Sequence, residues 1–198
     1  MSNVKIQSGR RRRICQGDIF REVECIERIA EKNGVIEVHK ILFPLIIVLT
    51  QDCDLEQDAN NRKKDTQNTA LLSVLVAPLY NAEHVFQGEH LSDLGLKMAQ
   101  ITKGRTPGID LMRNEKPRYH YVDFPDDVPL VPSIADFKHY FSVHVSYLES
   151  IRKTNFVCRL SDLFREDVSQ RFSAYLGRIG LPLVNRPRKQ CTNGRIGR

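Results

Sequence analysis

The stretch ILFPLIIVL, residues 41–49, is the longest apolar run in the chain and decides the expected fold. Its side chains do not alternate between polar and apolar, so residues 43–50 are predicted to form a strand buried on both faces. Just before it, Asn33-Gly34 stands between two isoleucine-rich segments, which is the strongest short hairpin signal. We therefore expect a hairpin pairing Cys25–Glu31 with Val35–Ile41, followed directly by the buried strand.

Other segments also show the patterns of strands and loops. Residues 14–20 are expected to form a short strand interrupted by a Gly-Asp step, and residues 118–124 another. Residues 70–77 are expected to form a second central strand that Pro78 ends. The cleanest alternation predicts a strand with Phe141, Val143, Val145 and Tyr147 facing inward. The polar segments 52–69, 104–117 and 123–133 are expected to be loops or connectors.

Two helices are expected, one over Ser92–Lys103 and one over Asp162–Ile179. Ser161 can cap the second helix, and Gly180 with Pro182 can end it. An apolar stripe on that helix predicts that it packs on the sheet. The fold class is then α+β and mostly β. One core is predicted, made of Ile46, Val48, Leu72, Val74, Val76, Phe141, Val143, Phe172 and Tyr175.

Length and composition predict a single globular domain over residues 14–182, with a basic arm at 1–13 and a disordered tail at 183–198. No apolar run reaches the ~18 residues that a membrane span needs. The five cysteines are scattered without a C-x-x-C pair, which argues against a disulfide framework and a metal site. We expect a cytoplasmic protein with no cofactor and no membrane association.

The net charge of +6 is concentrated at the two ends. Residues 1–13 and 186–198 each carry five Lys or Arg and no acid, and subtracting these ten charges leaves −4 for residues 14–185. Such arms can bind RNA or DNA phosphates without sequence preference, or serve only as solvated tails. The predicted nucleic-acid-binding residues are Arg10, Arg11, Arg12, Arg13, Arg118, Arg186, Arg188 and Lys189.

Three segments resemble, in order, the conserved strands of MazF/PemK-type toxins: QGDIF (16–20), FPLIIVL (43–49) and VLVAPL (74–79). The resemblance implies a bent, SH3-like β-barrel of five to seven strands decorated by two helices. Members of that family cleave or bind RNA, or bind a protein partner. Their catalytic Arg and Thr positions are occupied here by Phe43 and Leu79-Tyr80, so the ribonuclease chemistry is not expected to be intact.

The segment LTQDCDL (49–55), with RYHY (118–121) and the C-terminal helix, also resembles an uncharacterised group of bacterial and phage proteins. Asp52-Cys53-Asp54 follows the buried strand and is the candidate site. We predict Cys53 inward and inert, and Asp52 and Asp54 outward and available for binding. The alternatives are a structural role, in which Asp52 and Asp54 cap a turn or hold an arginine, and catalysis through the thiol, which needs a nearby histidine.

Arg118-Tyr119-His120-Tyr121 alternates basic and aromatic side chains. This pattern suits stacking on unpaired nucleobases or packing in the core. Together these features predict a nucleic-acid-associated component of a bacterial toxin–antitoxin or phage-defence module. The alternatives are a non-catalytic protein-interaction module and a Cys- or Asp-dependent hydrolase using residues 52–54. A protein partner and a homodimer are both left open.

Overall fold

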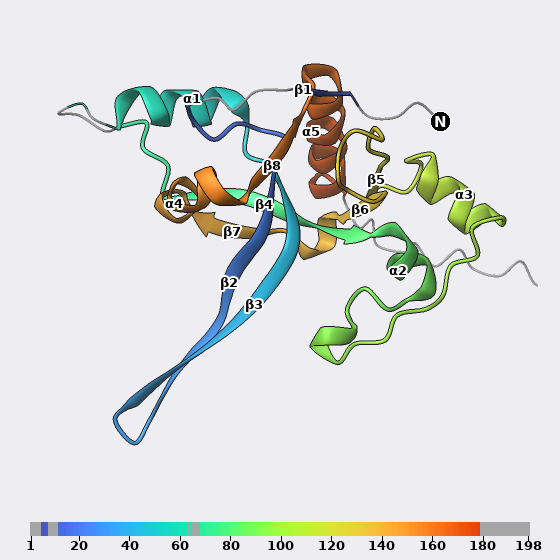
Figure 1. Cartoon of the computed structure of the whole chain (residues 1–198), viewed down its shortest axis with the longest axis horizontal. Coiled ribbons are helices and arrows are strands. Elements are labelled where there is room, and N and C mark those ends of the chain that lie inside the picture. Colours follow the sequence, from blue (N-terminus) through green and yellow to red (C-terminus); the bar gives the residue numbers. More distant parts are fainter. Residues whose placement is uncertain (1–4, 8–11, 63, 65–67, 179–198) are drawn as a thin grey trace, which may run out of the picture.

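The computed structural model describes residues 5–7, 12–62, 64 and 68–178. In this part of the chain eight strands form one antiparallel sheet that curls into a half-barrel, so the α+β, mostly β class is confirmed (Figure 1). The strand order is β1-β8-β2-β3-β4-β6-β5, and β7 also pairs with β4. The strands are β1 (Ile6–Gln7), β2 (Asp18–Lys32), β3 (Val35–Val48), β4 (Ser73–Asn81), β5 (Tyr119–Val122), β6 (Ser133–Asp136), β7 (Phe141–His144) and β8 (Phe156–Leu160).

Five α-helices and two short 3-10 helices accompany the sheet in the described residues, where two helices were expected. They are α1 (Asp52–Asn61), α2 (Ala82–Gln87), α3 (Thr106–Met112), α4 (Val145–Asn155), α5 (Asp162–Leu176), η1 (Ser92–Leu94) and η2 (Phe137–His139). The predicted C-terminal helix is confirmed as α5, and its packing on the sheet is confirmed by Val168 and Phe172, which are buried against sheet residues. Ser161 is its N-cap residue, but its side chain makes no capping hydrogen bond.

The predicted hairpin is confirmed and is longer than expected. Asn33 and Gly34 have φ values of 53° and 76°, the positive pair that a two-residue turn of this kind requires. β2 pairs with β8 only over Asp18–Phe20, and β3 pairs with β4 only over Ile46–Val48. The remainder of the hairpin therefore projects away from the body (Figure 1).

The prediction of one core is wrong, because the sheet buries side chains on both of its faces. Ile46 and Val48 belong to one cluster, with Val74, Val76, Phe141 and Val143, while Phe172 and Tyr175 pack in the other. Leu72 is 80% exposed. The two clusters share β2, β3 and β4, since alternate residues of one strand point to opposite faces. The single domain over residues 14–182 stays a prediction.

Several predicted boundaries are wrong. Residues 52–61 and 106–112 are helical rather than loops, and β4 continues through Pro78, which lies opposite Ile46. The predicted strand ends at His144, because its Nδ1 accepts a hydrogen bond from Ser146 N (3.2 Å) and caps α4. Of the predicted helix over 92–103 only η1 forms. The extended remainder pairs with the end of α2 through the bonds from Met98 N to Gly88 O and from Ile101 N to Phe86 O.

Candidate functional site

The Asp52-Cys53-Asp54 motif forms the first turn of α1 instead of an extended loop. Successive side chains of a helix point in different directions, so the two aspartates do not share a face. Asp52 is partly buried, whereas Cys53 and Asp54 are both exposed. The prediction of an inward Cys53 between two outward aspartates is therefore wrong.

The geometry around Cys53 does not provide a partner that could activate its thiol. Its Sγ has two acceptors within hydrogen-bond distance, Gln51 Oε1 (3.6 Å) and Asp54 Oδ1 (3.7 Å), and its single proton can go to one of them at a time. Within the described residues no histidine hydrogen-bonds to it. A cysteine nucleophile needs a base within hydrogen-bond reach, so the arrangement offers no support for thiol catalysis.

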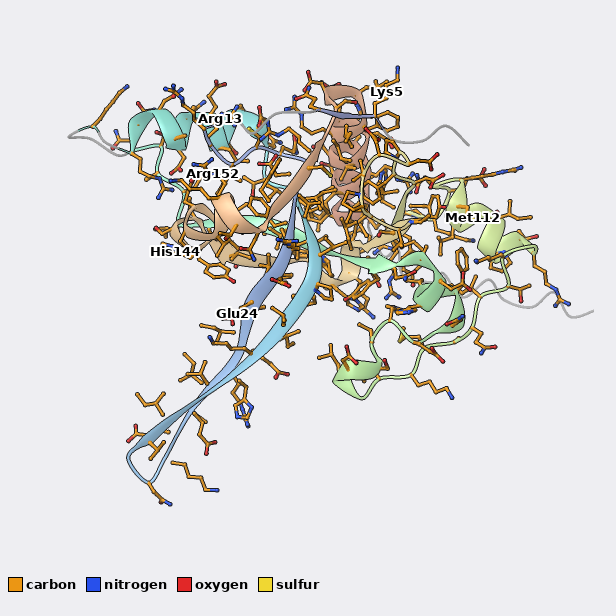
Figure 2. All side chains as sticks on the ribbon, viewed as in Figure 1. Lys5, Arg13, Glu24, Met112, His144 and Arg152 are labelled. Carbon is orange, nitrogen blue, oxygen red and sulfur yellow. The ribbon has the colours of Figure 1, made fainter. Side chains whose placement is uncertain are left out.

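Asp52 instead joins three parts of the chain. Arg13 donates from Nη1 to Oδ1 (3.0 Å) and from Nη2 to Oδ2 (2.9 Å), and Gln16 N donates to Oδ1 (3.2 Å). Arg165 Nη1 of α5 lies 3.4 Å from Oδ2. Partial burial acts to raise the pKa of Asp52, but the hydrogen bond and charge of Arg13 hold it below its usual value. Figure 2 shows Arg13 beside α1.

A buried ion pair lies next to this junction, between Asp18 of β2 and Arg159 of β8. Their side chains are 1% and 2% exposed, and Asp18 Oδ2 also accepts a hydrogen bond from Cys15 N (2.8 Å). Burial raises the pKa of Asp18 to about 6, although the hydrogen bond and charge of Arg159 act in the opposite direction. Burial also raises the pKa of the Cys15 thiol to about 11. Asp18 therefore has a hydrogen-bond partner at each of its two oxygens, Arg159 and Cys15 N. Together with the contacts of Asp52, these bonds hold residues 13–18 against α1, β8 and α5.

This junction predicts a structural role for Asp52. Asp52→Asn is expected to lower the free energy of unfolding by about 1–3 kcal/mol, because it weakens charge-assisted hydrogen bonds and removes the carboxylate that Arg13 and Arg165 share. The matched control is Asp54→Asn, two residues away and exposed, which should stay within about 0.5 kcal/mol of the wild type. Urea unfolding followed by circular dichroism measures both. Equal effects of the two substitutions would contradict the role of Asp52.

A second polar cluster surrounds Asp136, which is fully buried at the end of β6. Arg118 donates to it from Nε (2.8 Å) and Nη2, and Lys138 N donates to Oδ1 (3.0 Å). His139 Nδ1 lies 3.4 Å from Asp136 Oδ2 and 3.2 Å from the Tyr80 hydroxyl. Burial, acting with the charge of Arg118, lowers the pKa of His139. Asp136 thus fixes the orientation of the Arg118 guanidinium.

Three tyrosines lie around this cluster. The Arg118 guanidinium is 4.8 Å from the Tyr119 ring centroid, and the Arg178 guanidinium is 4.0 Å from that of Tyr175. Tyr140 packs edge-on against Phe172 of α5, with the ring centroids 5.4 Å apart, and is 42% exposed. α5 ends beside β6 (Figure 1), and the ring of Phe137, directly after β6, lies 5.4 Å from that of Phe172 and 6.1 Å from that of Tyr175. We call Arg118, Tyr119, Lys138, Tyr140, Tyr175 and Arg178 the aromatic–cationic surface.

The structure describes three of the eight predicted nucleic-acid-binding residues, and these three differ in exposure and in pairing. Arg118 belongs to the aromatic–cationic surface and pairs with Asp136, Arg12 is exposed, and Arg13 pairs with Asp52. Arg10, Arg11, Arg186, Arg188 and Lys189 lie outside the described residues. The side chains of β5 alternate, because His120 and Val122 are buried while Tyr119 and Tyr121 are half-buried. Asp136, Tyr140 and Arg178 were missed by the sequence reasoning; only the charge of Arg178 next to Tyr175 offered a signal.

A cavity of about 390 Å³ lies on the other side of Tyr80. Its lining includes Phe43, Leu91 and His90, whose ring centroid is 5.0 Å from that of Tyr80. Both ring nitrogens of His90 are buried without a hydrogen-bond partner among the described residues. Burial lowers the pKa of His90.

Metal binding and membrane insertion find no support in the described residues. Across residues 5–7, 12–62, 64 and 68–178, no group of three His, Cys, Asp or Glu side chains is arranged to hold a metal ion. The helices of the same segments are all too short or too polar to cross a membrane.

No protein-family model matches the chain, and no curated protein matches it.

Proposed function

We propose that the protein binds single-stranded nucleic acid through the aromatic–cationic surface, as a component of a bacterial toxin–antitoxin or phage-defence type module. One observation carries the proposal: Arg118 lies over the ring of Tyr119 and Arg178 over that of Tyr175, while Tyr140, which is 42% exposed, packs edge-on against Phe172 of α5. Base–aromatic stacking tolerates any sequence because every base has a π face, and neighbouring cations attract the phosphates.

The sequence downstream of α5 adds to this proposal. Residues 186–198 carry five Lys or Arg and no acid, and they begin eight positions after Arg178. A basic segment leaving from a stacking surface would raise the local concentration of nucleic acid there. Arg118 needs no reorganisation to contribute, because Asp136 already holds its guanidinium in place. The proposed binding is therefore selective for unpaired strands and blind to sequence.

Binding without cleavage is the form of the proposal that fits the resemblance to MazF/PemK-type toxins. We take the half-barrel as a divergent SH3-like barrel, in which Phe43 occupies the position of the family's catalytic arginine. Its ring stacks on Phe141 with the centroids 4.7 Å apart, so it serves in packing. A phenyl ring cannot donate a hydrogen bond to a phosphate oxygen, which favours a binder over a ribonuclease.

The stacking role can be tested at Tyr140, the most exposed of the three tyrosines. Tyr140→Ala is expected to weaken binding of a fluorescent 12-nucleotide oligo(U) by roughly 5- to 100-fold, since stacking of one base contributes about 1–3 kcal/mol. The matched control is Tyr147→Ala, a half-buried tyrosine on α4, which should bind like the wild type. Fluorescence anisotropy at fixed salt measures both, with circular dichroism to verify folding.

The electrostatic part has a separate readout. Deleting residues 186–198 should make the affinity for oligo(U) less dependent on salt, with the logarithmic slope reduced by about 0.7 for each phosphate that the tail neutralises in the full chain. Equal affinity for a duplex of the same length, or unchanged binding by both Tyr140→Ala and the deletion, would refute the proposal. The hydrolase alternative has no comparable support at residues 52–54. The protein-interaction alternative is favoured by a different feature, the projecting hairpin.

A further inference from the structure

The outer part of the β2–β3 hairpin, residues 24–42, carries an exposed apolar face; we call this segment the arm. Ile26, Ile29, Ile36, Val38 and Leu42 are between 46% and 68% exposed. The register pairs Ile29 with Val38, Glu31 with Ile36, Ile26 with Lys40 and Glu24 with Leu42, and paired residues of a hairpin point to the same side.

A bulge keeps this face continuous. The pairing shifts between Ile26 and Arg28, so Glu27 is the extra residue. Ile26 and Ile29 are three positions apart and would face opposite sides of a regular strand. With the bulge they face the same side, next to the even-numbered residues of β3. Val35, which is 61% exposed, points to the opposite side.

The arm has features of a surface that another chain covers. A two-stranded ribbon is marginally stable in water by itself. Here the outer halves of β2 and β3 pair with each other alone among the described residues, because β8 and β4 reach only the root of the hairpin. Contiguous aliphatic side chains on such a ribbon mark an interaction site.

We propose that the arm of a second copy of this chain covers this face, with the two arms packed antiparallel, the tip of each over the root of the other. A two-fold axis at the Ile29–Val38 rung places the Glu31–Ile36 rung of one copy over the Ile26–Lys40 rung of the second copy. The aliphatic side chains then meet at the centre. Glu31 comes within reach of Lys40 of the second copy, so the charges are complementary.

The root of the arm offers a place for the tip. The lining of a cavity of about 320 Å³ there includes Ile26 and Lys40 from the apolar face, Cys25 from the opposite face, and Val143, His144 and Tyr147 from β7 and α4. Glu24, at the same root, pairs with Lys40 (2.7 Å), and Figure 2 shows Glu24 on the arm and His144 near its root. Ile36 of the second copy would meet the apolar wall, and Glu31 would join the Glu24–Lys40 pair. A two-fold axis makes this contact twice.

Sedimentation equilibrium of the full-length chain over about 1–100 µM tests the proposal, since a self-association must respond to protein concentration. The wild type is expected to be dimeric in this range. Ile36→Asp should raise the dimer dissociation constant about tenfold or more, because it places a charge in the apolar contact. The matched control is Val35→Asp, an adjacent residue of similar exposure on the opposite side, which should leave the constant unchanged.

Exchanging the charges of Glu31 and Lys40 tests whether a weakened dimer results from a lost contact or from a loss of folding. Glu31→Lys and Lys40→Glu should each weaken the dimer, and the double variant should restore most of it, because each copy then again presents opposite charges at tip and root. A monomeric wild type throughout the range overturns the proposal and leaves the face for a different protein. Equal effects of Ile36→Asp and Val35→Asp, or no restoration in the double variant, also overturn it.

Discussion

Arg159→Met is expected to lower the free energy of unfolding at pH 7 by about 3–5 kcal/mol, because it leaves the Asp18 carboxylate buried without its counter-charge. Both side chains are almost fully enclosed, and Arg159 Nε donates directly to Asp18 Oδ1. The change should be measured by urea unfolding. Arg21→Met, at an exposed arginine of β2, is the control and should have a small effect.

The loss should depend on the charge of Asp18. Burial already raises the pKa of Asp18 to about 6, and removal of Arg159 raises it further, so at pH 5 the carboxyl is neutral and the loss should be smaller than at pH 7. The double variant Asp18→Asn with Arg159→Met should recover a large part of the stability, since Asn can still accept the hydrogen bond from Cys15 N. A loss below about 1 kcal/mol, or no recovery in the double variant, would show that the pair is not structural.

Acid should destabilise the protein through His120, which is buried on β5. Burial, together with the charge of Arg171, lowers the pKa of His120 to about 3, and its Nδ1 has no hydrogen-bond partner among the described residues. Below the ordinary histidine pKa of about 6.5, His120 is protonated in the unfolded chain but stays neutral in the folded chain. The folding stability is therefore complete above about pH 6.5 and falls as the pH drops towards 3, by on the order of 4–5 kcal/mol in total.

The measurement is the free energy of unfolding of the wild type and of His120→Phe between pH 3 and pH 7. Asp18 works in the opposite direction: its pKa is raised, so its contribution is lost as the pH rises from about 4 to about 6. Because both proteins contain Asp18, its contribution cancels in the difference between their free energies of unfolding. As the pH falls from about 6.5 towards 3, that difference should shift in favour of His120→Phe by up to about 1.4 kcal/mol per pH unit. An exposed control, His84→Gln, should follow the wild type. Parallel pH profiles for wild type and His120→Phe would contradict the assignment.

Part of the site could be expected from the sequence and part could not. Arg118-Tyr119-His120-Tyr121 showed its alternation locally, and the structure keeps it, with His120 inward. The residue that positions Arg118, however, is Asp136, 18 positions away on the neighbouring strand. Holding an arginine was one of the roles expected for Asp52, but the sequence could not name the partners, because Arg13 and Arg165 come from distant segments. The helix was not expected, because a polar stretch after a strand suits a loop as well as the first turn of α1.

The sequence by itself determined the hairpin, the buried end of β3 and α5, although burial begins at Ile46 and not at Phe43. Their signals lie within a few residues: a turn pair that permits positive φ, a run of apolar side chains, and an apolar stripe with the period of a helix. Only the tertiary structure decided which residues pair across the fold, such as Asp18 with Arg159, 141 positions apart. It also divided the core between two faces and ended β7 where His144 caps α4. The physical reason is that local patterns report backbone preference and burial, whereas buried charges are satisfied by whatever the fold brings within hydrogen-bond distance.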